Sequence, residues 1–486
     1  MAPNHPPITT PFLSTLDSAA TQNANDDPNY YVQDPKSLVS TSTVHSFTTG
    51  TGSAIYQSLI PLLESTAQEL VLVTCFWARS STLETLSAIL RTLSDKAIYR
   101  GGDKIRVRLC FSSLSLFQKL FHSQTTDGQL YPKSVWMKKL GFPSPRDLGG
   151  LDLQIKSIFL LPFSVMHPKF MIIDRQKVVL PSCNISWEEW FEGGIVMSGA
   201  VVNQFLRFYE EFWERSELPA LRDERNPPNK TNAGDAEART KDHGHAHLQL
   251  AFSSDRGHRI VKDIPTVFLP SPHRRNPVFK PFTPSERIIA PPTPLNLFIL
   301  TLFSKATKSI RIQTPNVTSP PVLSALLKAL ARGIDVRILT SEKLMVLEQL
   351  VTAGTTTVQC MRKLIKRYQK LRAAANGALE TDEEAAIASP RPGRLHISYF
   401  KPLGGPKSRG EEDGEPQQSH LKMTIVDGEV LVLGSGNLDR ASWFTSQELD
   451  IALFDRTLAE SVGKAVDEAM NGRERNIFNS RGGYTI

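Results

Sequence analysis

Apolar and polar positions along the chain predict the same series of elements twice. In the first block the series is a helix, a strand, a helix and a strand, over residues 54–68, 69–78, 82–94 and 104–112. In the second block the same four elements are predicted over residues 295–306, 308–314, 322–332 and 335–340. One further strand follows in each block, over residues 153–160 and 394–400. Strands that alternate with helices of this length predict an α/β fold with β-α-β units.

Three segments lack a sustained apolar period. Residues 1–45 are rich in Pro, Thr, Ser, Asn and Asp, a composition that predicts a disordered tail. Residues 216–290 are polar and then Pro-dense, as in a linker, and residues 476–486 are predicted as a second short tail. The two folded halves are therefore expected over residues 46–215 and 291–475.

Each half contains one motif with the same residue types at the same spacing. The first copy consists of His167, Lys169, Asp174, Ser182 and Asn184. The counterparts, each 253 residues later, are His420, Lys422, Asp427, Ser435 and Asn437. One HxKx₄D pattern is uncommon by chance in a chain of this composition, and two copies with matching Ser and Asn are far rarer. The pattern indicates an internal duplication.

The residue types of this motif suit chemistry on a phosphodiester. His and Lys at positions i and i+2 of an extended strand project from one face, so each copy offers an imidazole beside an ammonium. Cations and neutral Ser and Asn donors stabilise charge on phosphoryl oxygens, and imidazoles act as nucleophile, acid or base. The set lacks the carboxylate grouping that Mg²⁺ or Ca²⁺ requires, so we expect no metal and no cofactor.

The pattern HxKx₄Dx₆GSxN resembles the signature of the phospholipase D superfamily, which usually occurs in two copies. The resemblance covers both halves and extends to cardiolipin synthase-like phosphatidyltransferases. It implies an α/β fold of two layered halves, each of sheet and helices, packed pseudo-symmetrically around one active site. It also implies a metal-independent reaction through a phosphohistidine. Because one chain supplies both motifs, a monomer is expected to hold a complete site.

The same resemblance implies roles for the motif residues. His167 is expected to be the nucleophile and His420 the acid that protonates the leaving alcohol. Lys169 and Lys422 are expected beside them in the catalytic set. The residues expected to bind the substrate phosphate are Ser182, Asn184, Ser435 and Asn437.

Carboxylates outside the core of the motif complete the expected site. Glu448 lies where related enzymes place the carboxylate that hydrogen-bonds a catalytic His, and Glu192 is its best counterpart in the first half. Asp174 and Asp427 end their strands and are expected to support the site without carrying protons. The first copy departs from the family where Pro181 replaces Gly, and proline removes a backbone N–H that could touch the phosphate.

Composition narrows the class of protein. The chain has 486 residues, of which 40% are hydrophobic and 22% charged, values that argue against a wholly disordered chain. Its 4 Cys are isolated, which argues against a disulfide scaffold or a zinc site. We find no signal peptide, no mitochondrial presequence and no apolar run of about 20 residues. These features predict a cytoplasmic protein that meets membranes peripherally, with no transmembrane segment.

The substrate stays open between two classes of phosphodiester. Phospholipid is the leading hypothesis, since paired motifs in one chain are common in phospholipid-processing relatives. A nuclease is the alternative, favoured by the net charge of +7 and by a basic amphipathic segment over residues 361–372. That segment can lie on anionic lipid, follow nucleic acid, or simply pack on the second half. Trp187, Trp190 and Trp443 near the motifs are either core residues or walls of a substrate groove. A phosphate-binding scaffold without catalysis is the third reading.

Overall fold

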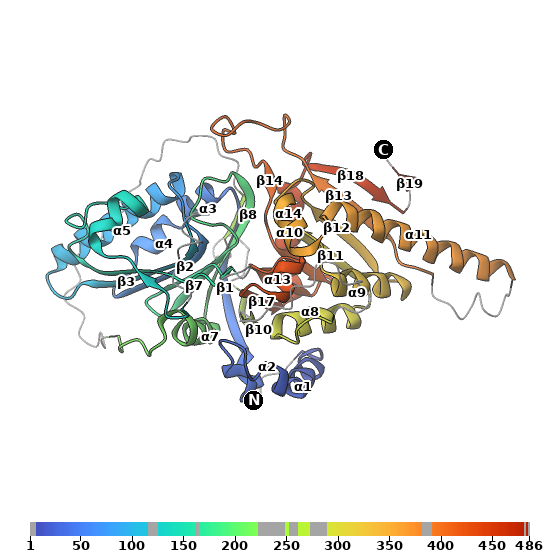
Figure 1. The fold of residues 1–486 in the computed structure, drawn as a ribbon, viewed down its shortest axis with the longest axis horizontal. Coiled ribbons are helices and arrows are strands. Elements are labelled where there is room, and N and C mark those ends of the chain that lie inside the picture. Colours follow the sequence, from blue (N-terminus) through green and yellow to red (C-terminus); the bar gives the residue numbers. More distant parts are fainter. Residues whose placement is uncertain are drawn as a thin grey trace.

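The computed structural model describes residues 6–114, 125–160, 165–221, 248–251, 261–272, 289–381, 391–480 and 483–484. Two halves of mixed sheet and helix lie side by side, the first on the left of Figure 1 and the second on the right. The predicted α/β class and its duplication are confirmed. No helix within the described ranges is long and apolar enough to cross a bilayer.

One sheet continues from one half into the other. In spatial order, its first-half strands are β4 (Gln129–Leu130), β5 (Leu151–Ser157), β3 (Ile105–Ser113), β2 (Glu69–Phe76), β6 (Phe170–Ile173), β7 (Lys177–Pro181), β8 (Trp190–Ser198) and β1 (Val39–Gly50). The order then runs through β10 (Val261–Ser271), β17 (Glu448–Phe454), β16 (Val430–Gly434), β15 (Met423–Val426), β11 (Ser309–Thr314), β12 (Asp335–Thr340), β13 (Leu395–Phe400), β18 (Glu474–Asn479) and β19 (Gly483–Tyr484). The second series mirrors the first, as a duplication requires.

Each half contains the predicted β-α-β units. Strands β2, β3 and β5 are parallel, as are β11, β12 and β13. The crossover helices are α5 (Ser81–Arg100) and α9 (Pro320–Ala331). Helix α5 begins where the Ser80 side chain accepts the Leu83 N–H and ends at Gly101, whose φ of 61° suits glycine. The predicted helix over 54–68 forms α3 (Gly52–Ser58) and α4 (Ile60–Glu64), and the one over 295–306 forms α8 (Pro294–Lys305).

The centre of the sheet corrects the predicted tail over residues 1–45. Strand β1 begins at Val39 and pairs with both β8 and β10. Before it, α1 (Thr9–Ser18) buries Phe12 completely, and the Phe12 ring packs edge-on against Phe298 of α8, with 5.3 Å between centroids. The prediction is wrong for residues 6–45; in β1, Ser and Thr fill most positions, so no apolar alternation marks the buried ones.

The predicted linker over residues 216–290 also contains sheet. Strand β10 lies between β1 and β17, and so joins the two halves, and β9 (Leu248–Ala251) pairs with β1. Pro265 and Pro270 within β10 disguise it as loop sequence. Much of the predicted linker lies outside the described residues. In the predicted tail over 476–486, β18 extends to Asn479 and pairs with β13. Both corrections enlarge the sheet at places where apolar alternation is weak.

The basic segment over residues 361–372 belongs to the long helix α11 (Thr357–Thr381), which projects from the second half (Figure 1). Its apolar stripe of Leu364, Ile365 and Tyr368 is buried. The Tyr368 hydroxyl donates to the Gly393 carbonyl at 2.9 Å. The stripe therefore packs on the second half, while the charged side chains of the helix face outward.

Candidate active site

The two motifs meet at the junction of the halves. His167 and Lys169 directly precede β6, and His420 and Lys422 directly precede β15. The two imidazole rings lie edge to face with 6.4 Å between centroids. Residues 253 positions apart thus share one site, which is built from a single chain.

Each histidine pairs with a carboxylate of the other half. His167 Nδ1 lies 2.8 Å from Glu448 Oε2, and His420 Nδ1 lies 2.7 Å from Glu192 Oε1. Both carboxylates are nearly fully buried. An imidazole whose Nδ1–H is held by a carboxylate keeps Nε2 free to attack phosphorus or to carry a proton. The sequence indicated both carboxylates without indicating that the pairs would be exchanged between halves.

Backbone pairing explains the exchange. Strand β14 (Gln418–Ser419) runs parallel to β8 and pairs Ser419 with Phe191, so the next residues, His420 and Glu192, come together. On the other side, the His167 N–H donates to the Gln447 carbonyl at 2.9 Å, one residue before Glu448. Gly193 permits the close approach, because a Cβ there would lie 2.7 Å from Leu421 Cδ1.

The motif serines hold the carboxylates. Ser182 Oγ donates to Glu192 and accepts the Gly193 N–H at 2.9 Å. Ser435 Oγ donates to Glu448 at 2.5 Å and accepts the Leu449 N–H at 3.0 Å. The serines expected to bind phosphate therefore fix the orientation of Glu192 and Glu448 in this structure.

The lysines differ between the two copies. Lys169 Nζ donates to the His167 carbonyl at 2.9 Å. Lys422 Nζ donates to the His420 carbonyl at 2.7 Å and also lies 2.8 Å from His420 Nε2. The His167 side chain is 15% exposed and that of His420 only 3%. His167 is thus the more accessible imidazole, and His420 is the one in contact with an ammonium.

Burial dominates the electrostatics of the site. It lowers the pKa of His167 and of His420 well below the usual range, and Lys169 and Lys422 lower it further. Burial raises the pKa of Glu192 and of Glu448 to about 7, against the opposing effect of the lysines and serine hydroxyls. It also lowers the pKa of Lys422 to about 7, against Glu192. Ionisable groups with pKa values near neutrality in one buried cluster are typical of catalytic sites.

The expected amide donors also differ. Asn184 Oδ1 accepts the Phe76 N–H at 3.3 Å. Asn437 Nδ2 donates to Asp439 at 3.0 Å, while Asn437 Oδ1 is buried without a hydrogen-bond partner among the described residues. A cavity of about 20 Å³, enough for one water, is lined by Lys422, Asn437 and Asp450.

Two residues of the site lie outside the motif and were not predicted from the sequence. Ser442, in α13 (Arg440–Phe444), donates to Glu448 at 2.6 Å, so that carboxylate accepts from two serines. Asp450 accepts the Gly436 N–H at 2.8 Å, and burial raises its pKa to about 7. Its position two residues after Glu448, on the same face of a strand, is the pattern that identifies it afterwards.

Asp450 also explains why the two motif copies differ in sequence. Gly434 pairs with Asp450 across β16 and β17, where any Cβ on Gly434 would collide with the carboxylate. In the first half Pro181 pairs with Gly194, so the bulk lies on the opposite strand. In each half, one of the two paired positions is a glycine that leaves room for the larger residue on the neighbouring strand.

Aromatic side chains border the site unequally. The Trp190 ring lies 4.7 Å from the His420 ring, centroid to centroid. Trp443 is buried. Trp187 is 42% exposed, with the Arg409 guanidinium 3.9 Å from its ring centroid. Of the three tryptophans, Trp190 contacts a motif residue and Trp187 reaches the surface.

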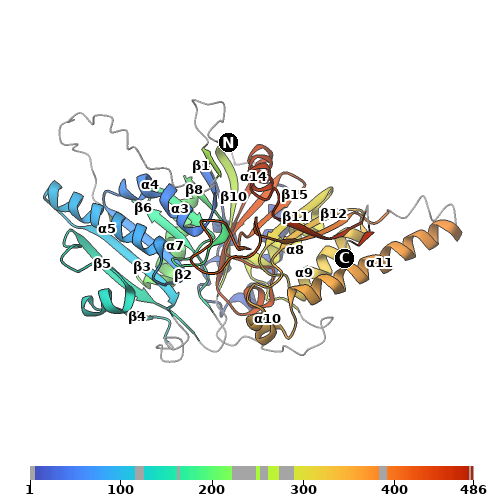
Figure 2. The ribbon, with the colours of Figure 1, turned by 90° about the horizontal axis from the view of Figure 1, so that it is seen from above.

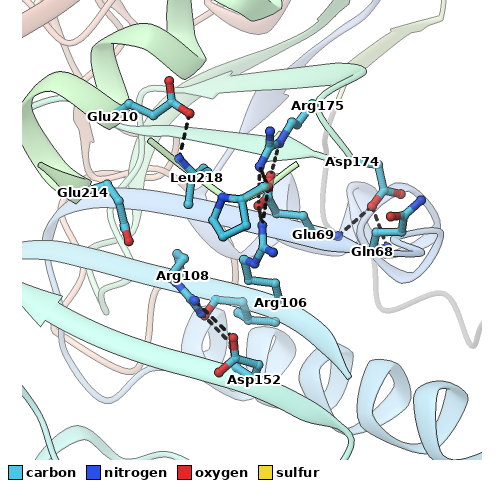
Figure 3. A network of polar contacts seen from close by, with 12 residues as sticks. Gln68, Glu69, Arg106, Arg108, Asp152, Asp174, Arg175, Glu210, Glu214 and Leu218 are labelled. Carbon is cyan, nitrogen blue, oxygen red and sulfur yellow. Dashed lines mark hydrogen bonds and ion pairs between the residues drawn. The ribbon is translucent and has the colours of Figure 1, made fainter. Parts of the chain in front are cut away.

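Asp174 and Asp427 bind backbone on the far side of the strands that carry the motifs. Five residues beyond the lysines, they lie roughly 16 Å along the chain from them. The N–H groups that Asp174 accepts, at 2.7–2.8 Å, belong to Ala67, Gln68 and Glu69. Figure 3 shows Asp174 beside Gln68 and Glu69. The N–H groups that Asp427 accepts, at 2.7–2.9 Å, belong to Thr307, Lys308 and Ser309. Both carboxylates anchor the start of the neighbouring strand.

Figure 3 also shows the ion pairs that surround Asp174. Glu69, which is 1% exposed, binds Arg106 at 2.7 Å and Arg175 at 2.8 Å. These contacts stabilise the first half at the edge away from the histidines. In the described parts of the chain, no three His, Cys, Asp or Glu side chains group as a metal site would.

Comparisons with known proteins agree with this architecture. Residues 299–470 match the family model described as "Cardiolipin synthase, PLD-like domain". The crystal structure of phosphatidylserine synthase from Haemophilus influenzae Rd KW20 is similar in fold, with a TM-score of 0.51 and 13% identity, over 97% of this chain and 94% of that one. Nuc from Salmonella typhimurium, a phospholipase D family member, matches 38% of this chain and 90% of its own at 20% identity, with a TM-score of 0.25. None of the curated proteins compared with the chain matches it.

The family model covers the second motif copy, its strands and the helix that follows them. The phosphatidylserine synthase structure shares the fold of both halves, whereas the match to Nuc is too weak to support an argument. The expected resemblance to the phospholipase D superfamily is therefore supported by the family-model match over residues 299–470, and the fold of the whole chain is similar to that of the phosphatidylserine synthase structure.

Proposed function

We propose that the chain is a metal-independent phosphodiesterase that acts on phospholipid, by hydrolysis or phosphatidyl transfer, through a covalent histidine intermediate. The observation that carries the proposal is the exchanged pairing of His167 with Glu448 and of His420 with Glu192 at one buried site. The match of residues 299–470 to a PLD-like domain supports phosphodiester chemistry. That family is described as cardiolipin synthase, which favours a lipid substrate.

In the first proposed step, the Nε2 lone pair of His167 forms a bond to phosphorus. The bond from phosphorus to the head-group oxygen breaks, and His420 gives the proton from its Nε2 to that oxygen. Lys422, with a pKa lowered by burial to about 7 and Nζ 2.8 Å from His420 Nε2, supplies that proton to His420. The greater exposure of His167 supports its role as the nucleophile.

In the second proposed step, water or an acceptor alcohol attacks phosphorus. Its proton passes to His420 and from there back to Lys422 as the bond between His167 and phosphorus breaks, which restores the starting protonation. Lys169 stabilises the negative charge on the phosphoryl oxygens, Lys422 does so while it holds its proton, and Asn184 and Asn437 are neutral donors. Ser182 and Ser435 contribute by holding Glu192 and Glu448. Each carboxylate in turn keeps the proton of its imidazole on Nδ1.

The test is turnover of defined substrates in the presence of EDTA. Purified chain is incubated with phosphatidylcholine, phosphatidylglycerol or single-stranded DNA, and the released head group, transferred phosphatidyl group or cleaved strand is measured. Release or transfer of a head group, lost in His420→Ala, supports the proposal. Cleavage of DNA alone assigns the chain to nucleases, and phosphate binding without turnover of any substrate makes it a scaffold. Either result refutes the lipid proposal.

A further inference from the structure

Helix α10 (Val346–Ala353) turns apolar side chains toward solvent. The residue before it and four of its own side chains are exposed: Met345 by 40%, Val346 by 37%, Leu347 by 76%, Leu350 by 44% and Val351 by 42%. Soluble proteins rarely display such a contiguous group of large apolar residues, and where they do it usually marks an interaction site. We call these five residues the α10 ridge.

Buried polar contacts hold the ridge in this orientation. Gln349, on the inward side of α10, is 3% exposed. Its amide donates to the Leu344 carbonyl at 2.7 Å and accepts the Thr357 N–H at 2.6 Å. Met345 enters the helix with a φ of 53°, which is uncommon for a residue other than glycine. Gln349 is therefore fixed inward and the large apolar side chains of the helix face outward, unlike the usual arrangement of a surface helix.

The ridge lies next to the candidate active site. Gln349 also lies near Asn316, just beyond the carboxyl end of β11, and α10 packs against α13. Ser442 of α13 holds Glu448, the carboxylate that binds His167. Figure 2 places α10 at the lower edge of the molecule, close to the line where the halves meet. A surface that settles on the ridge is therefore brought close to the paired histidines.

Exposed cations extend outward from the ridge. Helix α10 itself carries one charged residue, Glu348. Lys343 precedes the ridge and is exposed, and the exposed cations of the neighbouring α11 include Arg362, Lys363, Lys366, Arg367 and Lys370. None of these six takes part in an ion pair between described residues. Apolar side chains beside a row of cations match the surface of an anionic bilayer, whose acyl chains lie beneath negative head groups.

The first half presents a similar surface at the equivalent place. Strand β3 corresponds to β12, and the segment that follows β3 exposes Leu130 by 54% and Met137 by 53%. The exposed cations around them are Lys133, Lys138 and Lys139. Because the two parallel strands are equivalent in the duplicated fold, both segments leave the sheet at its active-site edge. Both halves therefore present apolar and cationic side chains at that edge.

We propose that the α10 ridge is the element with which the chain enters the surface of an anionic phospholipid bilayer, with the cations of α11 binding the head groups. The inference rests on the proposed function, since the ridge would bring the active site to the membrane that contains its phospholipid substrate. A second copy of the chain is the less favoured occupant, because it would bring two sets of unpaired cations toward each other.

The test compares vesicle binding with turnover of a soluble lipid. Wild type and Leu347→Ser/Leu350→Ser are sedimented with vesicles of phosphatidylcholine mixed with phosphatidylglycerol. We expect the variant to bind roughly ten- to a hundredfold more weakly, since two exposed leucines lose their burial in lipid. Turnover of a short-chain phospholipid below its critical micelle concentration should stay within about twofold of wild type. Ile98→Ser/Tyr99→Ser, at two exposed residues of α5, is the matched control and should bind as wild type does.

Charge is tested separately with Lys363→Gln/Lys366→Gln. On mixed anionic vesicles we expect about fivefold weaker binding for each cation removed, with no change on pure phosphatidylcholine. Equal binding by wild type and the leucine variant overturns the proposal. So does an unchanged vesicle affinity together with a change from dimer to monomer, which would assign the ridge to a second copy. If the ridge is needed for binding but wild type turns over no phospholipid, the surface stands and the proposed lipid function fails.

Discussion

Separate replacement of the two exchanged carboxylates tests the roles of the two histidines. Glu192→Gln keeps the size of the side chain next to His420 but removes its charge, and Glu448→Gln does the same next to His167. A hydrogen bond to a charged partner contributes about 1.5–3 kcal/mol. Loss of that amount from the transition state lowers kcat by roughly 10- to 150-fold. We expect each variant to lose this much on a natural phospholipid.

The leaving group separates the two variants. In the proposed mechanism His420 protonates the head-group oxygen, and Glu192 stabilises the imidazolium that does so. A phosphatidyl ester of p-nitrophenol needs no such proton, because the phenolate leaves readily without one. Glu192→Gln should therefore regain most of its first-step rate on this ester. Glu448→Gln should stay slow on both substrates, because Glu448 orients the nucleophile His167.

The assay is single-turnover kinetics with both substrates, so that the first chemical step is seen alone. Near-wild-type rates for Glu192→Gln on the natural lipid would show that the pair with His420 has no catalytic part. Recovery on p-nitrophenyl ester by Glu448→Gln, and not by Glu192→Gln, would reverse the roles of His167 and His420. The thermal stability of both variants is measured as a control, because a general loss of stability would lower the rates on the two substrates equally.

Three further predictions concern the supports of the site. Asp427→Asn should lower the free energy of unfolding by about 1–3 kcal/mol at pH 7. Burial opposes ionisation of Asp427, but hydrogen bonds from backbone N–H groups outweigh it and lower the pKa of Asp427. The stability that the carboxylate contributes is therefore present above about pH 4 and is lost as the pH falls through the lowered pKa. Chemical denaturation that shows the same loss in the variant at pH 3 as at pH 7 would contradict this. Gly193→Ala should lower the free energy of unfolding by about 1–3 kcal/mol and reduce turnover, because the new Cβ would collide with Leu421. The control Gly149→Ala, whose Cβ would make only an ordinary contact, should lower it by less than about 1 kcal/mol. Equal shifts in melting temperature for the two variants would refute this. Asp450→Asn should gain stability relative to wild type as pH rises from 4 to 8, because burial raises the pKa of Asp450 to about 7; a pH-independent difference in melting temperature would contradict it.

The duplicated motif was readable from the sequence because each copy is local and its spacing is fixed. The helices and strands with clear apolar periods, such as α5 and β12, were equally predictable. The middle of the sheet was not. Strand β1 is rich in Ser and Thr, and β10 contains two prolines, so burial there is set by neighbouring strands and not by local composition.

The exchange of carboxylates between halves was also beyond the sequence. Spacing relates Glu192 to the motif of its own half, but the contact with His420 depends on the parallel pairing of β14 with β8, far apart along the chain. Asp450 escaped notice for a similar reason. Its partner is the N–H of Gly436, just beyond the end of β16, and its spacing from Glu448 in β17 gains a meaning only once that contact is seen.

The central claim is that a histidine of one half attacks phosphorus while a histidine of the other half provides the proton. It is tested most directly by mass spectrometry of the enzyme quenched during turnover of phosphatidylglycerol. The account predicts a covalent phosphatidyl group on His167, stable to base and labile to acid, that is absent from His167→Ala. A group on His420 would reverse the roles, and turnover with no group on either histidine would contradict the account.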